Sequence, residues 1–525
     1  MFNRTSLQVS AALASISLVA GCGVFSEDGG TADQKITVGT TSAPSSLDPA
    51  AAWDGSWELY RNVYQTLLSF PTGSVSPQPD AADCKFDGTS SQVFRCELHE
   101  GLKFSNGDEL DAAAVKHSFD RIIKIDSPTG PAGLLGSLKS VKTEGDRVVV
   151  FQLKEPDATF PFILAAPAMS IVDPKDYPAD KLRTGNEITG SGPYVLDGYE
   201  KKKKAELSKN PNYKGFADRK NNSVTIEYFE DSDTMVTALK DKRIDVIYRG
   251  LTASEVVDLQ GKKGGDSGIN LVESTGADIR YLVFNAKDPA VRKLPVRQAI
   301  AQVIDRGALV STVYKGTAEP LYSMVPKGIS GHTTSYFDRY GEPDPAKARR
   351  TLRAAGITEP VALTLGYTTD RYGSSTKAEF TEIKRQLEAS GLFKVTLQGA
   401  PWDTFQESYG KGEYPVFGRG WFPDFPDPDN FIAPFVGKQN ALKTPYENAK
   451  ITKDLLPDSR RMTVRKDAAD VLKAAQEALV DDTRLLPLWQ GKLYVAGSEE
   501  IAGSERALDP QTVMQMWEFQ RKASW

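Results

Sequence analysis

A run of prolines and acids restricts the local fold more than any other stretch of this sequence. It reads Arg419-Gly420-Trp421-Phe422-Pro423-Asp424-Phe425-Pro426-Asp427-Pro428-Asp429-Asn430-Phe431 and follows an apolar run, residues 414–417, that predicts a short buried strand. Proline lacks an N–H and fixes φ, so three prolines exclude a helix and most sheet pairing. The stretch therefore predicts a rigid, irregular loop at the end of a strand. Two interpretations stay open, a ligand site and a solvated surface turn.

Length and charge narrow the class of protein. The 525 residues predict roughly three domains, at about 150 residues each. The net charge is −5, and the short basic run at residues 201–204 is typical of a solvated turn or strand end. Since no larger basic cluster interleaves with aromatic residues, we expect no nucleic-acid partner.

The N-terminus predicts export. Residues 7–20 are mildly apolar and too short for a membrane-spanning helix, which needs about 20 apolar residues, so residues 1–21 are interpreted as a secretory leader. Leu18-Val19-Ala20-Gly21-Cys22 resembles the bacterial lipobox, which implies cleavage before Cys22 and lipid attachment to its sulfur. The alternative is a signal peptide that contains a cysteine by chance. Residues 22–34 then form a lipid-anchored flexible linker.

The remaining cysteines fit an oxidising compartment. Cys84 and Cys96 flank a turn signal at Asp87-Gly88-Thr89, and residues 93–98 alternate as a strand does, so we expect a disulfide across a hairpin. A metal site is the alternative. It is rejected because the three histidines are scattered without ligand spacing, and we expect neither a metal nor another cofactor.

Strands and helices alternate along the rest of the chain, which predicts an α/β protein with helices packed on a mostly parallel or mixed sheet. The clearest helix has Asp111 as its cap and turns Val115, Phe119 and Ile122 inward. The expected strands are 36–39, 148–153, 194–196, 224–229, 244–247, 281–285, 363–367, 395–397, 485–489 and 493–495. Further helices are expected at 57–70, 235–240, from 294 to near 307, 344–355, 380–387 and 464–480.

Five separated motifs carry a family resemblance. They are Gly101-Leu102-Lys103-Phe104-Ser105-Asn106-Gly107; Gly190-Ser191-Gly192-Pro193-Tyr194 with Asn210-Pro211-Asn212-Tyr213; Val296-Arg297-Gln298-Ala299-Ile300 with Asp305-Arg306; Asp344-Pro345 through Ala355-Gly356; and Gly420-Trp421 with Asp424 and Pro428. Each is weak alone, but they stand in the family's order. From about residue 36 onward the chain resembles the peptide and oligopeptide family of solute-binding proteins of bacterial ABC importers.

The resemblance implies a fold of two lobes, like the type II periplasmic binding proteins, with an extra small α+β domain. Lobe I would comprise residues 35–78, 190–275 and 482–525, with the extra domain, 79–189, inserted in it; lobe II would comprise 276–481. It also implies a function: ligand is captured between the lobes by a hinge closure and delivered to an ABC permease and its ATPase subunits. The protein would be a monomer, lipid-anchored on the outer face of the cytoplasmic membrane.

The resemblance also implies which residues bind the cargo. In peptide-binding members the acid of the Gly-Trp-x-x-Asp pattern, here Asp424, pairs with the ligand's α-ammonium group, and Trp421 walls the cleft beside it. The loop 43–46, with Ser45 and Ser46, would bring backbone groups of lobe I to the ligand. Arg419 is displaced from the position where some relatives meet a peptide's carboxylate. Arg280 is the other candidate for that role, with a structural ion pair as its alternative.

Other functions stay open beside peptide binding. The same fold could carry an oligosaccharide, a metal chelate or an opine-like compound, because a fold does not fix a ligand. An extracytoplasmic hydrolase is the remote alternative. We expect no enzyme, since the sequence lacks a Gly-x-Ser-x-Gly elbow, a His-Glu-x-x-His helix and a phosphate loop. Asp427 and Asp429 are interpreted as turn residues rather than calcium ligands.

Overall fold

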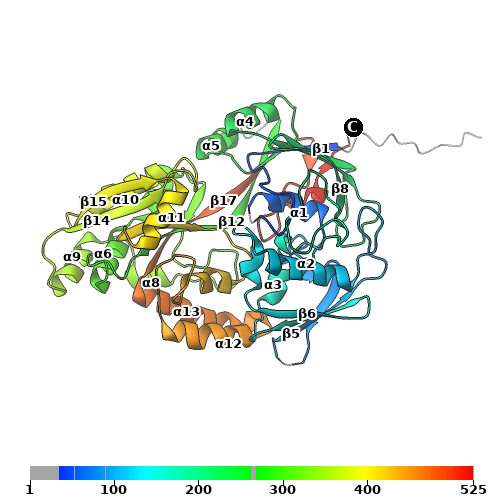
Figure 1. Ribbon diagram of the computed structural model, residues 1–525. Helices are drawn as coiled ribbons and strands as arrows, with labels where there is room; N and C mark the ends of the chain where they lie inside the picture. The colour runs from blue at the N-terminus through cyan, green and yellow to red at the C-terminus, as the bar shows by residue number, and fades with distance from the viewer. Residues whose placement is uncertain (1–34, 53, 89, 262–267, 524–525) are drawn as a thin grey trace, which may run out of the picture.

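The structure is a computed structural model, and it describes residues 35–52, 54–88, 90–261, 268–523. In this part of the chain, eleven strands form one mixed sheet in the order β15-β14-β16-β12-β17-β11-β1-β10-β9-β8, with β13 paired to β17. Its two central strands, β12 (Ile269–Phe284) and β17 (Leu485–Ser498), are long and antiparallel, and they cross the middle of the molecule from one lobe to the other (Figure 1). The expected strand at 281–285 is therefore only the end of β12. Those expected at 485–489 and 493–495 are one continuous strand.

The first lobe lies on one side of these two strands. Its strands β1, β10 and β11 are parallel; β9 pairs antiparallel with β10, and β8 pairs antiparallel with β9. The elements are β1 (Lys35–Thr40), β8 (Tyr194–Glu200), β9 (Lys204–Lys209), β10 (Ser223–Tyr228), β11 (Val246–Tyr248), α1 (Ser56–Val63), α4 (Ser232–Lys240) and α5 (Ala253–Gly261). The C-terminal segment returns here, with β18 (Ile501–Ala502) and β19 (Gln520–Arg521).

Helix α1 is shorter than expected, because the helix predicted over residues 57–70 ends at Val63 and Tyr64 is extended. A contact from far along the chain stops it. The Val63 carbonyl accepts a hydrogen bond from Gly192 N at 3.0 Å. A side chain on Gly192 would collide with the backbone of Val63 and Tyr64. Residues 68–69 instead form strand β2 (Leu68–Ser69), which pairs with β3 (Gln78–Pro79).

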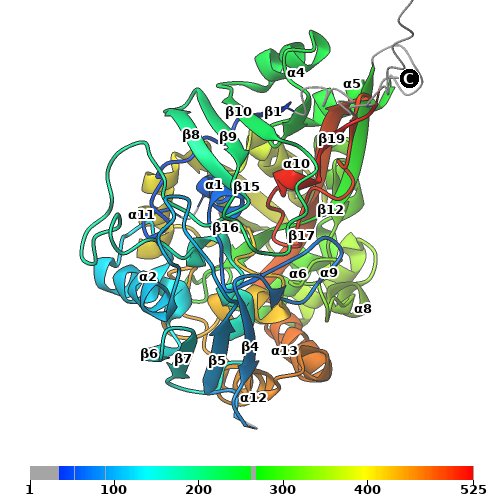
Figure 2. The ribbon, with the colours of Figure 1, turned by 90° about the vertical axis from the view of Figure 1, so that its right-hand side faces the viewer.

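A small α+β unit lies beside the first lobe. Its sheet has the order β4-β5-β7-β6 and is covered by α2, whose cap Asp111 accepts a hydrogen bond from Ala114 N as predicted (Figure 2). Cys84 and Cys96 face each other on β4 and β5 and form the expected disulfide. The elements are β4 (Ala82–Phe86), β5 (Val93–Leu98), β6 (Leu138–Glu144), β7 (Val148–Leu153), α2 (Ala112–Ile125) and α3 (Phe160–Leu164).

This unit shares one hydrophobic core with the first lobe, and Phe94, Phe151 and Ile226 belong to the same cluster. A buried ion pair adds to the junction. Arg121 of α2 contacts both carboxylate oxygens of Asp48, at 2.7 and 2.8 Å, and both side chains are 1% exposed. The expected residue limits of the domains stay a prediction.

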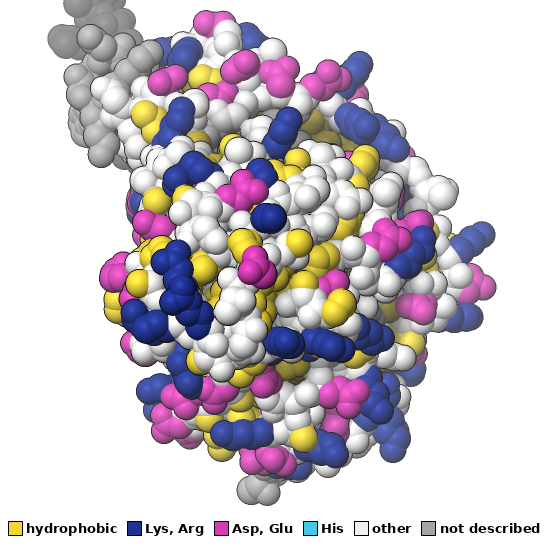
Figure 3. All heavy atoms as spheres, turned by 90° about the vertical axis from the view of Figure 1, so that its left-hand side faces the viewer, with side chains coloured by type: hydrophobic (Ala, Val, Ile, Leu, Met, Phe, Trp, Pro, Cys, Tyr) yellow, Lys and Arg dark blue, Asp and Glu magenta, His cyan; other side chains and the backbone are white. Residues whose placement is uncertain are grey.

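The second lobe carries the other end of the sheet. There β14 is parallel to β15 and to β16, while β16 is antiparallel to β12. The elements are β13 (Ala318–Pro320), β14 (Val361–Thr368), β15 (Phe393–Ala400), β16 (Val416–Trp421), α6 (Leu294–Val303), α7 (Arg306–Val313), α8 (Ser335–Tyr340), α9 (Pro345–Ala354), α10 (Thr376–Ala389), α11 (Trp402–Lys411), α12 (Leu456–Arg461) and α13 (Ala469–Asp482). Lysines and arginines are interspersed with acids on the face of this lobe that Figure 3 shows.

Two helix predictions in the second lobe are wrong in their limits. The helix expected from residue 294 to near Gly307 is two helices, because Asp305 caps a new one by accepting a hydrogen bond from Ala308 N. The helix expected over 464–480 begins at Ala469, after a 3-10 turn, and Val464 is exposed. Within the described ranges, no helix is both long enough and apolar enough to cross a bilayer.

Candidate functional site

The proline-rich stretch continues a strand before it becomes a loop. Residues Arg419 to Trp421, expected in the loop, are the end of β16, with Trp421 opposite Ile279 and Gly420 opposite Arg280 on β12. Pairing can run this far because the first proline is Pro423. The remainder is irregular and ends in a 3-10 turn, Pro428–Phe431. This edge is also where the parallel strands of the second lobe end, a usual place for ligands in α/β sheets.

Asp424 is buried, with 5% of its surface exposed. Its carboxylate Oδ2 accepts a hydrogen bond from Asn430 Nδ2 at 2.8 Å, and its backbone N donates to Asn430 Oδ1 at 2.9 Å. Trp421 Nε1 donates to the same Asn430 oxygen at 3.1 Å. The acid and the tryptophan that the resemblance singles out are thus brought together by a third residue, Asn430.

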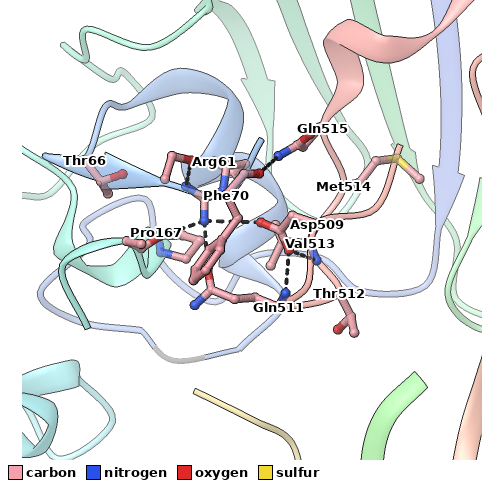
Figure 4. A network of polar contacts seen from close by, with 12 residues as sticks. Arg61, Thr66, Phe70, Pro167, Asp509, Gln511, Thr512, Val513, Met514 and Gln515 are labelled. Carbon is pink, nitrogen blue, oxygen red and sulfur yellow. Dashed lines mark hydrogen bonds and ion pairs between the residues drawn. The ribbon is translucent and has the colours of Figure 1, made fainter. Parts of the chain in front are cut away.

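The loop is also fastened to the first lobe. The Asp424 carbonyl accepts a hydrogen bond from Gln511 Nε2 at 2.7 Å, and Gln511 belongs to the C-terminal segment. Gln511 Oε1 in turn accepts from Arg61 Nη2 at 2.8 Å, and Arg61 lies 3.3 Å from Asp509 (Figure 4). Phe425 packs against Phe162 with ring centroids 6.3 Å apart. Asp424 therefore lies at the contact between the two lobes.

Each of the next two aspartates of the stretch forms a bidentate ion pair with an arginine. Asp427 accepts from Arg465 Nε and Nη2 at 2.7 and 2.9 Å, and Asp429 accepts from Arg460 Nε and Nη2 at 2.9 and 2.8 Å. Asp427 Oδ1 also accepts from Asp429 N, which closes the turn before the short 3-10 helix. Their positions agree with the interpretation of both as turn residues. Across the described ranges, no group of three His, Cys, Asp or Glu side chains could hold a metal ion.

Two buried arginines lie beside the acidic loop, on β12 and β16. Arg280 is enclosed by rings, with its guanidinium carbon 4.4 Å from the Tyr372 centroid, 5.2 Å from Phe422 and 5.0 Å from Trp489. Arg419 lies over Tyr409 at 5.0 Å and donates a hydrogen bond to its hydroxyl. Stacking of this kind holds the plane of a guanidinium without using its N–H groups.

These arginines keep hydrogen-bonding capacity. Among the described residues, neither Arg280 Nε nor Arg419 Nε has a hydrogen-bond partner. Arg280 donates to the Ile279 carbonyl at 3.1 Å and lies 3.5 Å from Asp278, so the alternative of a structural ion pair is partly realised. The cavity that both arginines line measures about 10 Å³, enough for about one water. Phe422, whose ring lies against Arg280, is 46% exposed.

An acid behind this cluster is held in an apolar setting. Glu379 accepts hydrogen bonds from Tyr314 Oη at 2.8 Å and from Trp489 Nε1 at 3.0 Å. Burial raises the pKa of Glu379 because the charged form loses its hydration.

The serines of the first-lobe loop lie after β1, at the carboxyl edge of three parallel strands. Ser45 is exposed and Ser46 half-buried. The N–H groups of Ser45 and Ser46 point to Ser56 Oγ at 3.1 and 3.5 Å, and the Ser46 carbonyl accepts from Tyr60 Oη at 2.7 Å. These hydrogen bonds make the loop rigid. They also occupy some of the backbone groups that could otherwise bond a ligand. Cys22 lies outside the described residues.

Sequence reasoning missed most residues that build this site. Gln511, Arg460 and Arg465 have no signature in the sequence, and they follow the aspartates they contact by 31 to 87 positions. For Asn430 a signal existed, because an asparagine beside a buried turn often bonds the backbone.

Comparisons with known proteins give a family model and several relatives of this chain. The family model described as bacterial extracellular solute-binding proteins, family 5 middle, matches residues 76–443. The probable D,D-dipeptide-binding periplasmic protein DdpA of Escherichia coli K12 is 26% identical over 484 residues, which cover 89% of this chain and 90% of the relative.

Solved structures share the fold. The Helicobacter pylori ABC transporter-associated periplasmic binding protein DppA, in complex with the peptide STSA, gives a TM-score of 0.75 at 23% identity and covers 93% of this chain and 98% of its own. The binding protein AgaA of A. tumefaciens R10, in complex with agropinic acid, gives 0.74 at 20% identity and covers 94% and 99%. The two-lobed α/β fold is thus confirmed.

Proposed function

The chain belongs to the bacterial extracellular solute-binding proteins of family 5, and on that basis we propose that it captures peptides between its lobes for an ABC importer. The observation that carries the proposal is Asp424, a buried acid at the contact between the lobes, held by Asn430 beside Trp421. The relative DdpA is named as a probable D,D-dipeptide-binding protein, and H. pylori DppA was solved with the peptide STSA.

Asp424 is proposed to bind the α-ammonium group of the peptide. Enclosing an ammonium without a counter-charge is costly, so one carboxylate at one end fixes the register of the ligand as well as binding it. The neighbouring acids Asp427 and Asp429 are each paired with an arginine, so neither is proposed for this role. Trp421 would form the wall beside it.

Arg280 and Arg419 are proposed to receive the carboxylate at the other end of the ligand. Their Nε groups are buried without hydrogen-bond partners among the described residues, and an anion would supply the missing acceptors. Ser45 and Ser46 are proposed to contact the backbone of the ligand from the first lobe. Backbone contacts do not depend on the peptide's sequence, which suits a protein that accepts several peptides.

The anchor and the assembly complete the proposal. Cys22 would carry the lipid and residues 22–34 the flexible linker, so that a monomer stands at the outer face of the membrane beside its permease and ATPase subunits. Mass spectrometry of the mature N-terminus tests the anchor. We propose no catalytic step, and peptides incubated with the protein should be recovered intact.

The decisive variant is Asp424→Ala. We expect it to weaken binding of a free peptide by about 2–5 kcal/mol, because one side of a desolvated charge pair is lost. Calorimetry with a set of di- to tetrapeptides and their N-acetylated forms measures this directly. Equal affinity of the unaltered protein for both forms would contradict the role of Asp424.

An acid of the opine class is the second candidate cargo, and AgaA with agropinic acid supports it. Such a ligand would rely on Arg280 and Arg419 more than on Asp424. Mass spectrometry of the compound that co-purifies with the protein separates the two candidates.

A further inference from the structure

Asn430 connects the two side chains that the proposed function places at the ligand's amino end. It is 3% exposed, and its side chain takes part in three hydrogen bonds, with Trp421 Nε1, Asp424 N and Asp424 Oδ2. The chemistry of these partners fixes the orientation of the amide. Trp421 Nε1 and Asp424 N can only donate, so they face the Asn430 oxygen, and the amide NH₂ must face the carboxylate.

The backbone of the same aspartate is held separately. Gln511 Nε2 donates to the Asp424 carbonyl at 2.7 Å, and Gln511 is itself fixed by Arg61 within the network of Figure 4. The Asp424 backbone thus has an anchor on the first lobe that does not involve Asn430. A change at Asn430 should therefore leave the loop docked.

We infer that Asn430 is a positioning residue, which orients the Asp424 carboxylate toward the ligand's α-ammonium group and fixes Trp421 in the wall beside it. This inference rests on the proposed function. An amide that donates to one carboxylate oxygen sets the rotation of the group without neutralising its charge. Its effect should therefore appear in the preference for a free over a blocked amino group, and not in overall ligand binding alone.

The test compares two asparagines by calorimetry. Asn430→Ala removes the three bonds described above. Asn440→Ala is the matched control, since Asn440 also makes three, to Gly437, Thr444 and Leu442, away from the proline-rich stretch. For trialanine, tetraalanine and their N-acetyl forms, we expect Asn430→Ala to lower the ratio of free to acetylated affinity at least tenfold. Asn440→Ala should leave that ratio unchanged.

Asn430→Asp gives a second readout that a purely structural role would not produce. It keeps the size of the side chain and both accepting bonds, so the fold should survive. It places a second carboxyl within 2.8 Å of Asp424, where two carboxylates do not readily ionise together. The pair of carboxyls should then lose its last proton between about pH 5 and 8, because each carboxylate disfavours ionisation of the other. Affinity for the free peptide should therefore rise more steeply over this pH range in Asn430→Asp than in the unaltered protein.

The outcomes are distinguishable. The inference is supported if the ratio of free to acetylated affinity is well above one in the unaltered protein, is lost in Asn430→Ala, and depends on pH in Asn430→Asp. A high ratio that both variants retain overturns the inference and leaves the proposed function standing. A ratio near one in the unaltered protein, or no binding of either peptide, overturns the proposed function and the inference with it.

Discussion

The buried charges of the acidic loop after β16 are paired with opposite charges, whereas those of the arginines beside it are stacked on aromatic rings. Asp427 and Asp429 each have an arginine in bidentate contact, at distances of 2.7–2.9 Å. Arg280 and Arg419 instead lie on aromatic rings, and their Nε atoms have no acceptor among the described residues. Both groups occupy the same edge of the same sheet.

The difference distinguishes charged groups that hold the fold together from charged groups that are still able to bind a ligand. A buried charge is costly unless it is paired, so the paired aspartates stabilise a fixed loop and have little capacity left for a ligand. Guanidinium groups held by stacking are oriented in advance and still have N–H groups to donate. The acidic loop is therefore held rigidly, and the arginines are the groups that we propose to bind an anion.

The largest expected effect comes from breaking one of the paired charges. Arg465→Ala should destabilise the protein by about 3–5 kcal/mol, because it leaves Asp427, 2% exposed, without its counter-ion. Chemical denaturation measures the loss. Arg461→Ala is the control: its pair with Asp458 is as short, at 2.8 Å, but both side chains are more than half exposed. It should cost less than about 0.5 kcal/mol.

Similar losses in the two variants would contradict the distinction between framework and surface pairs. Asp427→Asn combined with Arg465→Met should recover part of the stability lost in Arg465→Ala, since no unpaired charge is then left buried.

Local chemistry explains which parts of the fold were predictable. The Cys84–Cys96 hairpin and the Asp111 cap were predicted correctly because turn residues, alternation and capping act within a few positions. The end of α1 was not, because a glycine 129 positions away, Gly192, takes the Val63 carbonyl. The first part of β12 was missed as well, since residues 269–275 are all half-buried or exposed and show no apolar run.

The candidate site divides in the same way. Asp424 and Trp421 could be named because a short motif carries them, and the strand before them is apolar. Their partners could not, because Gln511 and Arg465 reach the loop only through the tertiary fold. That Arg280 is enclosed by Tyr372, Phe422 and Trp489 also depends on pairing between distant strands.

An intermediate effect is expected at the arginines. Arg280→Met should change stability little, because an apolar side chain fits among the rings and removes an incompletely bonded cation. It should weaken binding of a peptide with a free carboxylate, relative to the C-terminal amide, by about 1.5–3 kcal/mol, the usual contribution of hydrogen bonds to a charged group. Calorimetry with both peptide forms and a denaturation curve give the two values.

Arg306→Met is the matched control for that change. Arg306 is also buried and stacked, 4.8 Å from the Tyr322 centroid. Its Nη2 has no hydrogen-bond partner among the described residues, but its Nε donates to the Pro487 carbonyl inside the second lobe. The preference for the free carboxylate should persist in this variant. An equal loss of preference in both variants, or none in Arg280→Met, would refute the assignment of the anion site.

The smallest change in stability is expected for a variant of Asp80. Asp80 and Asp509 are two buried carboxyls near a single guanidinium, that of Arg61. Burial raises the pKa of Asp80 and of Asp509 to about 6, and the nearby positive charge of Arg61 only partly opposes it. A carboxyl with a raised pKa in the folded state contributes stability that is present below its unfolded pKa of about 4 and is lost as the pH rises through about 6. Asp80→Asn should therefore gain stability relative to the unaltered protein between pH 4 and 7, by about 1–2 kcal/mol.

Denaturation curves at intervals across that range measure the gain, with Asp458→Asn on the surface as the control. A difference between Asp80→Asn and the unaltered protein that stays constant with pH would show that Asp80 is ionised throughout. Arg61 would then neutralise both carboxyls, and this centre would belong with the paired charges of the acidic loop. A difference that grows toward pH 7 would show that Arg61 compensates its two acids only in part, since one cation cannot fully neutralise two carboxylates in an interior that excludes water. The centre at Arg61 would then be intermediate between the fully paired aspartates of the acidic loop and the stacked arginines.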